Sequence, residues 1–212
     1  MRPSIRFLDE QLITRILDEA RELLRTLGVT IHNSEVLTIL GDYGAEVDMA
    51  AEHAKFTDDM VDKALKTARQ VAHLNPDLEF IAEAAMLHDI GIAQTDAAQI
   101  GCRGSLPYVC HGIAGRKLLE PYHLPQHGLV CERHVGVGIT AADIKTRQLP
   151  MPLRNMVPVS LEETIICYAD KFFSKKNGAQ ELPFHIILKD LGRFGRDKIE
   201  RFMQWHRLFS TS

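Results

Sequence analysis

The sequence predicts an all-α fold, a helical bundle preceded by an N-terminal helical arm. Apolar residues recur at three- and four-residue steps from Phe7 to Leu27, which is the period of an amphipathic helix. The stretch from Glu83 to Gly91 is rich in small and apolar residues and ends on a glycine, a common helix terminator. Ser160 and Glu163 have the spacing of a capping box, which predicts a helix that starts there.

The remaining elements follow in chain order. Ser34 is a good helix start and predicts a second helix in the arm. Residues 45–56 are less regular. Thr57 precedes two aspartates, and this pattern predicts the first helix of the bundle because acids favour the positive end of a helix. We therefore expect an arm over residues 1–56 and a bundle over residues 57–212.

Composition narrows the class of protein. The chain has 212 residues, enough for one well-packed domain with an appendage. The net charge of -3 argues against binding of nucleic acid through bulk charge. No apolar run is long enough to span a membrane and no signal sequence opens the chain, so we expect a soluble, cytoplasmic protein. The four cysteines lack CxxC spacing, which favours free thiols.

Several histidines and aspartates lie at predicted helix ends or on apolar helix faces. His88 and Asp89 are adjacent at the end of the Glu83–Gly91 helix, and His111, His134 and Asp170 follow on later helices. Each histidine alone is more often a hydrogen-bonded core residue, and a basic neighbour is an alternative partner for Asp170. Together, imidazole nitrogens and carboxylate oxygens are the ligand types that suit Fe, Mn, Zn, Ni or Mg. Facing helices of a bundle can build such a site.

Four short motifs then point to a family. His88–Gly91, Cys110–Gly112, Glu132–His134 and Tyr168–Lys171 resemble, in the same order, motifs of the HD-domain (HDIG) metal-dependent phosphohydrolase superfamily. The resemblance extends from about Val61 to Leu208. It implies an HD-domain helical bundle with one or two divalent metal ions as cofactor.

The resemblance also implies roles for individual residues. His88, Asp89 and Asp170 would hold the first metal, while His111 and His134 would hold a second metal or contact phosphate. Metal-activated water would attack a small phosphorylated substrate, such as a nucleotide, with no nucleic acid or membrane as partner. The catalytic residues would be Asp89, His111, His134 and Lys171.

Some features depart from the family pattern. The family has another metal-binding histidine on the helix before the His-Asp helix, and Phe56 stands in its place here. His53, one helical turn away, is the candidate substitute ligand. Arg133 and Arg116 are candidate phosphate-binding residues, although a cation at such a position is more often a solvated charge. The alternative to an enzyme is therefore a non-catalytic HD-like module, a ligand sensor or dimerisation unit, with a degenerate metal site.

The first part of the chain has a resemblance of its own. Ala20–His32, Leu40–Asp48 and Phe56–Ala68 resemble the N-terminal segment of trimethylamine methyltransferase-like corrinoid proteins, over about residues 7–70. That segment precedes a barrel, and the sequence here contains no barrel, so methylamine chemistry is not inferred. We expect the segment to be an arm that packs against the bundle or supports a homo-oligomer.

Overall fold

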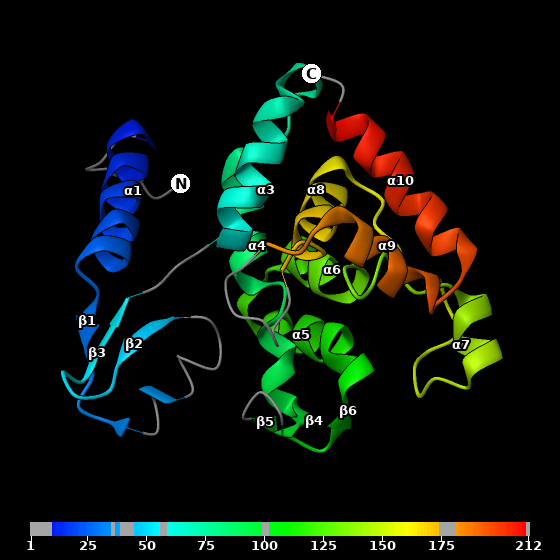
Figure 1. Cartoon of the computed structure of the whole chain (residues 1–212), viewed down its shortest axis with the longest axis horizontal. Helices are drawn as coiled ribbons and strands as arrows, with labels where there is room; N and C mark the ends of the chain where they lie inside the picture. Colours follow the sequence, from blue (N-terminus) through cyan, green and yellow to red (C-terminus); the bar gives the residue numbers. More distant parts are fainter. Residues whose placement is uncertain are drawn as a thin grey trace, which may run out of the picture. The chain divides into compact units, whose positions relative to one another are not determined.

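The structure is a computed structural model that describes residues 10–34, 37–38, 45–55, 59–98, 102–173 and 181–210. The chain divides into two compact units, Met1–Asp58 and Asp59–Ser212 (Figure 1).

The first unit combines one helix with a small antiparallel sheet. Helix α1 spans Glu10–Thr26, and the strands β1 (Val29–Thr30), β2 (Glu46–Asp48) and β3 (His53–Lys55) pair in the order β1-β3-β2. Ala54 is the central residue of this sheet, opposite Val29 on one side and Val47 on the other. A purely helical arm was therefore the wrong expectation. The second helix predicted from Ser34 falls mostly outside the described residues.

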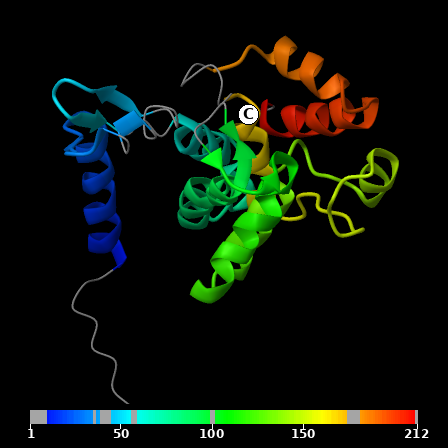
Figure 2. The ribbon, with the colours of Figure 1, turned by 90° about the horizontal axis from the view of Figure 1, so that it is seen from below.

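The second unit is mainly helical. Its helices are α3 (Asp59–Gln70), α4 (Leu78–Leu87), α5 (His111–Leu119), α6 (Pro125–Arg133), α7 (Ala141–Arg147), α8 (Leu161–Asp170), α9 (Phe184–Gly192) and α10 (Arg196–Ser210). Short 3-10 helices, including η2 (Ile90–Gln94) and η4 (Tyr108–Cys110), join them. Helix α7 lies at the periphery of this unit in both views (Figures 1 and 2).

A second three-stranded sheet lies between η2 and η4 in the chain. Strand β4 (Thr95–Ala97) pairs antiparallel with β5 (Cys102–Arg103) and parallel with β6 (Leu106–Pro107). With two sheets present, the protein is a mixed α/β protein, and the prediction of an all-α HD-domain bundle is wrong. Strands of two or three residues are too short to produce the alternation that identifies a strand in a sequence.

The core of the second unit forms around α8. This helix contacts α3, α4, α6 and α10, and Figure 1 shows it between α3 and α10. Ile165 and Ile166 are fully buried, and the Tyr168 ring stacks on Phe202 of α10 with centroids 5.2 Å apart. Because the helix is enclosed by its neighbours, the residues at its carboxyl end have a fixed position.

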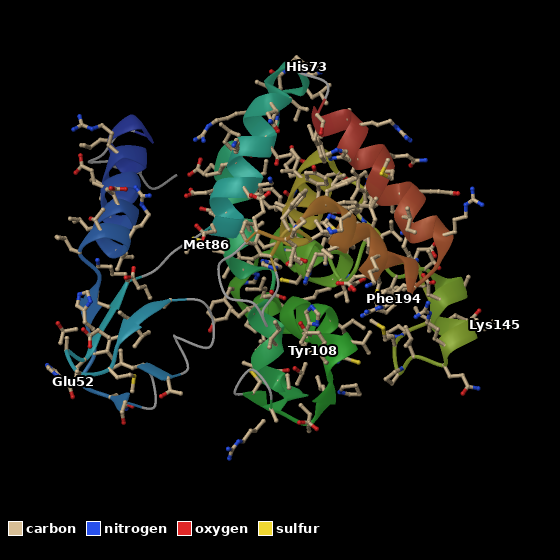
Figure 3. The ribbon with its side chains drawn as sticks, in the orientation of Figure 1. Glu52, His73, Met86, Tyr108, Lys145 and Phe194 are labelled. Atoms are coloured by element: carbon tan, nitrogen blue, oxygen red, sulfur yellow. The ribbon has the colours of Figure 1, made fainter. Side chains whose placement is uncertain are left out.

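Side-chain caps fix where the helices begin. Asp77 accepts a hydrogen bond from Phe80 N at 2.9 Å and starts α4. Ser160 accepts one from Glu163 N at 3.1 Å and starts α8, as the sequence predicts. The reciprocal bond of a capping box is replaced, because the Glu163 carboxylate accepts from Val159 N instead. Figure 3 shows how densely side chains fill the space between these helices.

In the part of the chain that the structure describes, no helix combines the length and the apolar character needed to cross a bilayer.

Candidate functional site

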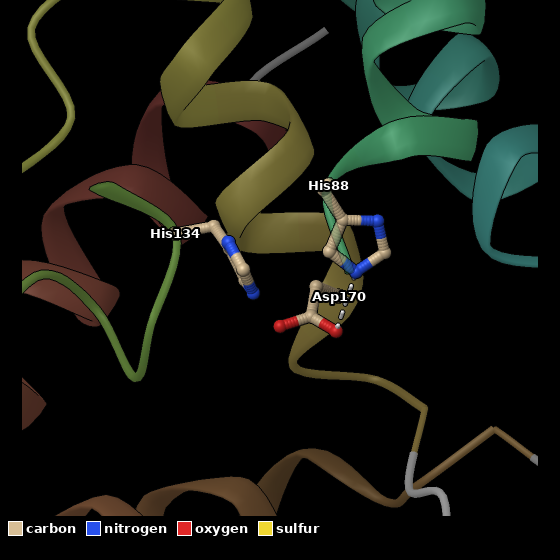
Figure 4. A group of neighbouring side chains, drawn as sticks. All are labelled: His88, His134 and Asp170. Carbon is tan, nitrogen blue, oxygen red and sulfur yellow. Dashed lines mark ion pairs between the residues drawn. The ribbon is translucent and has the colours of Figure 1, made fainter. Parts of the chain in front are cut away.

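Five side chains from four segments of the second unit converge on one point, and we call them the His–Asp cluster. His88 caps the end of α4, Asp89 follows it, His111 begins α5, His134 caps the end of α6 and Asp170 is the last residue of α8. Figure 4 shows His88, His134 and Asp170 directed toward one another. The structure thus brings together residues that are far apart in the sequence.

The distances within the cluster are short. His88 Nε2 lies 3.0 Å from a carboxylate oxygen of Asp89 and 3.5 Å from one of Asp170. Asp89 is also the common partner of the other two rings, at 3.5 Å from His111 Nε2 and 3.3 Å from His134 Nε2. Asp89 therefore lies at the centre of the cluster.

The three imidazole rings are oriented in the same way. The Nδ1 atom of His88 lies 2.6 Å from Ala85 O, that of His111 2.7 Å from Tyr108 O, and that of His134 2.8 Å from Cys131 O. A carbonyl can only accept a hydrogen bond, so each Nδ1 must carry the proton and donate. Each Nε2 then points its lone pair into the cluster whenever its ring is neutral.

This orientation favours a positive charge between the facing imidazole nitrogens. His111 Nε2 and His134 Nε2 are only 3.1 Å apart, and two lone pairs facing each other at that distance repel. A proton on one ring or a shared cation relieves the repulsion. Two groups of donor atoms, His88/His134/Asp170 and Asp89/His111/His134, each lie within 4.8 Å of one another and could hold a metal ion.

Burial and neighbouring charges shift the pKa values of His88 and His134 in opposite directions. Burial alone would lower the pKa of His88, but the carboxylates of Asp89 and Asp170 outweigh it and raise that pKa to about 10. Burial lowers the pKa of His134, and the neighbouring His88 charge lowers it further against the opposite pull of Asp89. At neutral pH the cluster therefore pairs a protonated His88 with a neutral His134.

Two glycines allow the helices to approach closely enough to form the cluster. A Cβ atom on Gly91 would lie 2.8 Å from Gly115 Cα and closer still to His111 O and Gly115 N. A Cβ atom on Gly112 would lie 2.8 Å from Val135 Cγ2 and closer still to Cys131 O. The first contact brings Asp89 next to His111, and the second brings His111 next to His134.

A cavity of about 340 Å³ adjoins the cluster. Among the residues lining it are His111, His134 and Asp170 of the cluster, together with Lys171. Most of the remaining wall is apolar, formed by residues of the loop after α6 and of α9.

The chain is 27% identical to a tRNA (cytidine(56)-2'-O)-methyltransferase of Thermoplasma volcanium over 177 residues, which is 82% of this chain and 46% of that protein. It is 31% identical to the protein of the same name from Picrophilus torridus over 116 residues, 54% of this chain and 30% of that protein. An uncharacterized protein of Methanocaldococcus jannaschii is 30% identical over 95 residues, 44% of this chain and 48% of that protein.

The similarity is partial. The chain spans less than half the length of the curated relatives it matches. No family model matches the chain. No solved structure matches it either.

These findings overturn the family interpretation. The two named relatives are tRNA methyltransferases, which contradicts both the HD-domain and the trimethylamine methyltransferase-like resemblance. A phosphohydrolase with a small phosphorylated substrate and divalent metal ions as its cofactor is therefore wrong. The alternative of a non-catalytic HD-like module gains no better support. Motif residues can form a site of similar geometry without fixing the reaction that the site performs.

The exclusion of nucleic acid is also corrected. The relatives' printed name makes tRNA their substrate, whereas the net charge of -3 argued against any nucleic acid. Net charge is a sum over the whole chain and does not report where individual cations lie, so it was a weak basis for that exclusion.

The other candidate residues fall into two groups. Lys171 caps the end of α8, and its Nζ lies 2.7 Å from Asp170, so it adjoins the cluster. Arg116 donates to Glu132 at 2.6 Å, and Arg133 donates to Glu163 at 2.8 Å. Both glutamates are buried, and a buried carboxylate needs such a partner. The sequence pattern did not reveal these glutamates as partners.

His53 does not occupy the helix on which its suggested role depended. It lies in β3 of the first unit, opposite Thr30 and Asp48 in the sheet. Phe56 and Thr57, which defined the expected helix start, lie outside the described residues. We therefore assign His53 no place in the cluster.

Proposed function

We propose that this chain takes part in the 2'-O-methylation of tRNA and that the His–Asp cluster is its functional centre. Two relatives carry the corresponding name. A match of 177 residues within a chain of 212 must include the whole interval from His88 to Lys171, wherever the match begins. The cluster thus belongs to the part of the chain that resembles a tRNA methyltransferase, and this observation carries the proposal.

The chemistry of the reaction gives the cluster a role. Methylation of a ribose 2'-hydroxyl forms an oxygen–carbon bond, breaks the sulfur–methyl bond of a sulfonium donor such as S-adenosylmethionine, and releases the hydroxyl proton. Neutral His134, with its Nε2 lone pair directed inward, is suited to accept that proton. Asp89 would stabilise the resulting imidazolium, since it lies 3.3 Å from the same nitrogen.

Two neighbouring residues, His111 and Lys171, would position the carboxylate and stabilise developing charge. His111 shares Asp89 with His134 and would orient the carboxylate. Lys171 would stabilise negative charge that develops on the ribose oxygen. With tRNA as its partner, we place the chain in the cytoplasm.

Transfer of labelled methyl groups tests this proposal. The purified chain would be incubated with unfractionated tRNA and S-adenosylmethionine carrying a tritiated methyl group, and the label in tRNA would be counted. We expect incorporation above that of a donor-plus-tRNA blank, and a loss of about 100-fold or more for His134→Gln, the usual scale of general-base catalysis. His185→Gln, an exposed histidine on α9, is the matched control and should behave as wild type. Label at the blank level with wild-type protein would refute the proposal.

A further inference from the structure

The cavity beside the cluster has a composition that suggests its ligand. Its apolar wall includes Val109, Val135, Ile139, Leu149 and Leu191. These residues come from η4, the α6–α7 loop, the segment that follows α7, and α9. The wall can therefore accept a flat apolar body that enters from the surface and reaches the cluster.

Two aromatic rings add stacking surfaces. Tyr108 and Phe194, both labelled in Figure 3, line the cavity from different segments and are partly exposed, at 37% and 54%. Arg147 fixes Phe194 in two ways, by donating to its carbonyl oxygen at 2.6 Å and by lying 5.1 Å from the centre of its ring. Rings held at the rim of a cavity are the feature with which proteins stack unpaired nucleic-acid bases.

Charged side chains line the same cavity beside the apolar wall. Lys171 lines the cavity beside His111 and His134 and pairs with Asp170, and Lys198 lines it and pairs with Asp143. With Arg147, three cations line the cavity against these two carboxylates. An excess of cations next to apolar and aromatic walls favours a ligand with a flat ring at one end and an anionic group at the other. A nucleotide has this combination.

The volume limits the size of the ligand. About 340 Å³ is at the lower end of ligand sites, which range from about 300 to 1,000 Å³. One nucleotide can enter such a space, whereas a base-paired helix cannot. A nucleotide of a folded RNA would have to leave its stack first, as the target nucleotide does in enzymes that modify bases within nucleic acids.

We infer that this cavity binds a single unstacked nucleotide of the RNA substrate, with its base between the apolar wall and the two rings and its phosphate near Lys171. The inference rests on the proposed function and specifies which part of tRNA reaches the cluster. It assigns Leu149, Tyr108 and Phe194 to substrate recognition, a role that the sequence patterns did not suggest.

Binding of cytidine 5'-monophosphate, measured by calorimetry, is the first test, with cytidine as the phosphate-free comparison. We expect saturable binding of the monophosphate and at least tenfold weaker binding of cytidine. Lys171→Gln should reduce affinity for the monophosphate to the level of cytidine. Lys189→Gln, which removes an exposed charge on α9 away from the cavity, should leave the affinity unchanged.

Filling the cavity is the second test. Leu149→Trp should weaken binding at least tenfold, whereas Leu153→Trp, at a side chain that is 67% exposed nearby in the chain, should not. Phe194→Ala serves if Leu149→Trp fails to fold, and should weaken binding about fivefold or more, the scale of losing one stacked ring. Equal affinity of Leu149→Trp and Leu153→Trp would overturn the inference.

The two proposals can fail separately. If wild-type protein transfers methyl groups to tRNA but binds no cytidine monophosphate, the cavity is not a nucleotide site and only this inference is wrong. If neither activity is found, the proposed function is wrong as well.

Discussion

The close contact between η2 and α5 makes Gly91→Ala a sensitive test of how the cluster is assembled. The new Cβ atom would lie 2.8 Å from Gly115 Cα and closer to two further backbone atoms of α5, His111 O and Gly115 N. Real Cβ contacts are essentially never shorter than 3.0 Å. No rotamer change can relieve a collision with backbone, so η2 and α5 must move apart.

The loss of stability expected for Gly91→Ala follows from these short contacts. Overpacking a core costs about 1–3 kcal/mol when side chains can adjust. Three backbone contacts below the limit put Gly91→Ala at the upper end, about 3 kcal/mol of the free energy of unfolding. The same displacement separates Asp89 from His111, whose ring nitrogen lies 3.5 Å from the carboxylate. We therefore expect the activity of the cluster to fall together with the stability.

Urea denaturation followed by circular dichroism measures the effect, and Gly192→Ala is the matched control. A Cβ atom on Gly192 would meet only Ile199 Cδ1, at an ordinary 3.4 Å, so stability should change by less than about 1 kcal/mol. A Gly91→Ala protein with the same denaturation midpoint as the Gly192→Ala protein would refute the account of helix packing.

Two further predictions concern charged groups. Arg133→Leu leaves the buried Glu163 carboxylate without its guanidinium partner, so the free energy of unfolding measured with urea should fall by about 3 kcal/mol. Arg196→Leu breaks an exposed ion pair and should lower it by less than about 1 kcal/mol. Similar losses for the two variants would show that burial does not determine the cost. Burial raises the pKa of Asp143, but hydrogen bonding, chiefly from Lys198, outweighs this and holds the pKa below the ordinary 3.8. Because the folded-state pKa is the lower one, the stabilisation is present above pH 3.8 and is lost as the pH falls through the folded-state pKa. Asp143→Asn should therefore flatten the acid limb of a plot of stability against pH, and an unchanged limb would contradict the assignment.

The meeting of His88, Asp89, His111, His134 and Asp170 could be anticipated because each residue stood at a predicted helix end or on an apolar face. Side chains at such positions are buried between the packed helices, where an unpaired polar group costs free energy, so they are expected to pair with one another. The common ring orientation has a local cause as well, since each Nδ1 binds the carbonyl oxygen three residues earlier.

Other features could not be read from the sequence. The strands of the two sheets have two or three residues and leave no periodic signal. Arg116 and Arg133 looked available for phosphate because nothing in the sequence indicated that Glu132 and Glu163 would be buried beside them. The reaction was misjudged for a related reason: motif residues fixed a geometry, and the geometry is compatible with more than one chemistry.

Quantifying 2'-O-methylated nucleosides in tRNA by mass spectrometry, with Asp89→Asn and Asp190→Asn compared, tests the central role of the cluster most directly. Asp190 is a carboxylate on α9 that pairs with Arg193 at 3.2 Å, outside the cluster. Our account predicts that wild-type and Asp190→Asn proteins produce the same methylated nucleoside and that Asp89→Asn produces about 100-fold less of it. Equal yields from the two variants would contradict it.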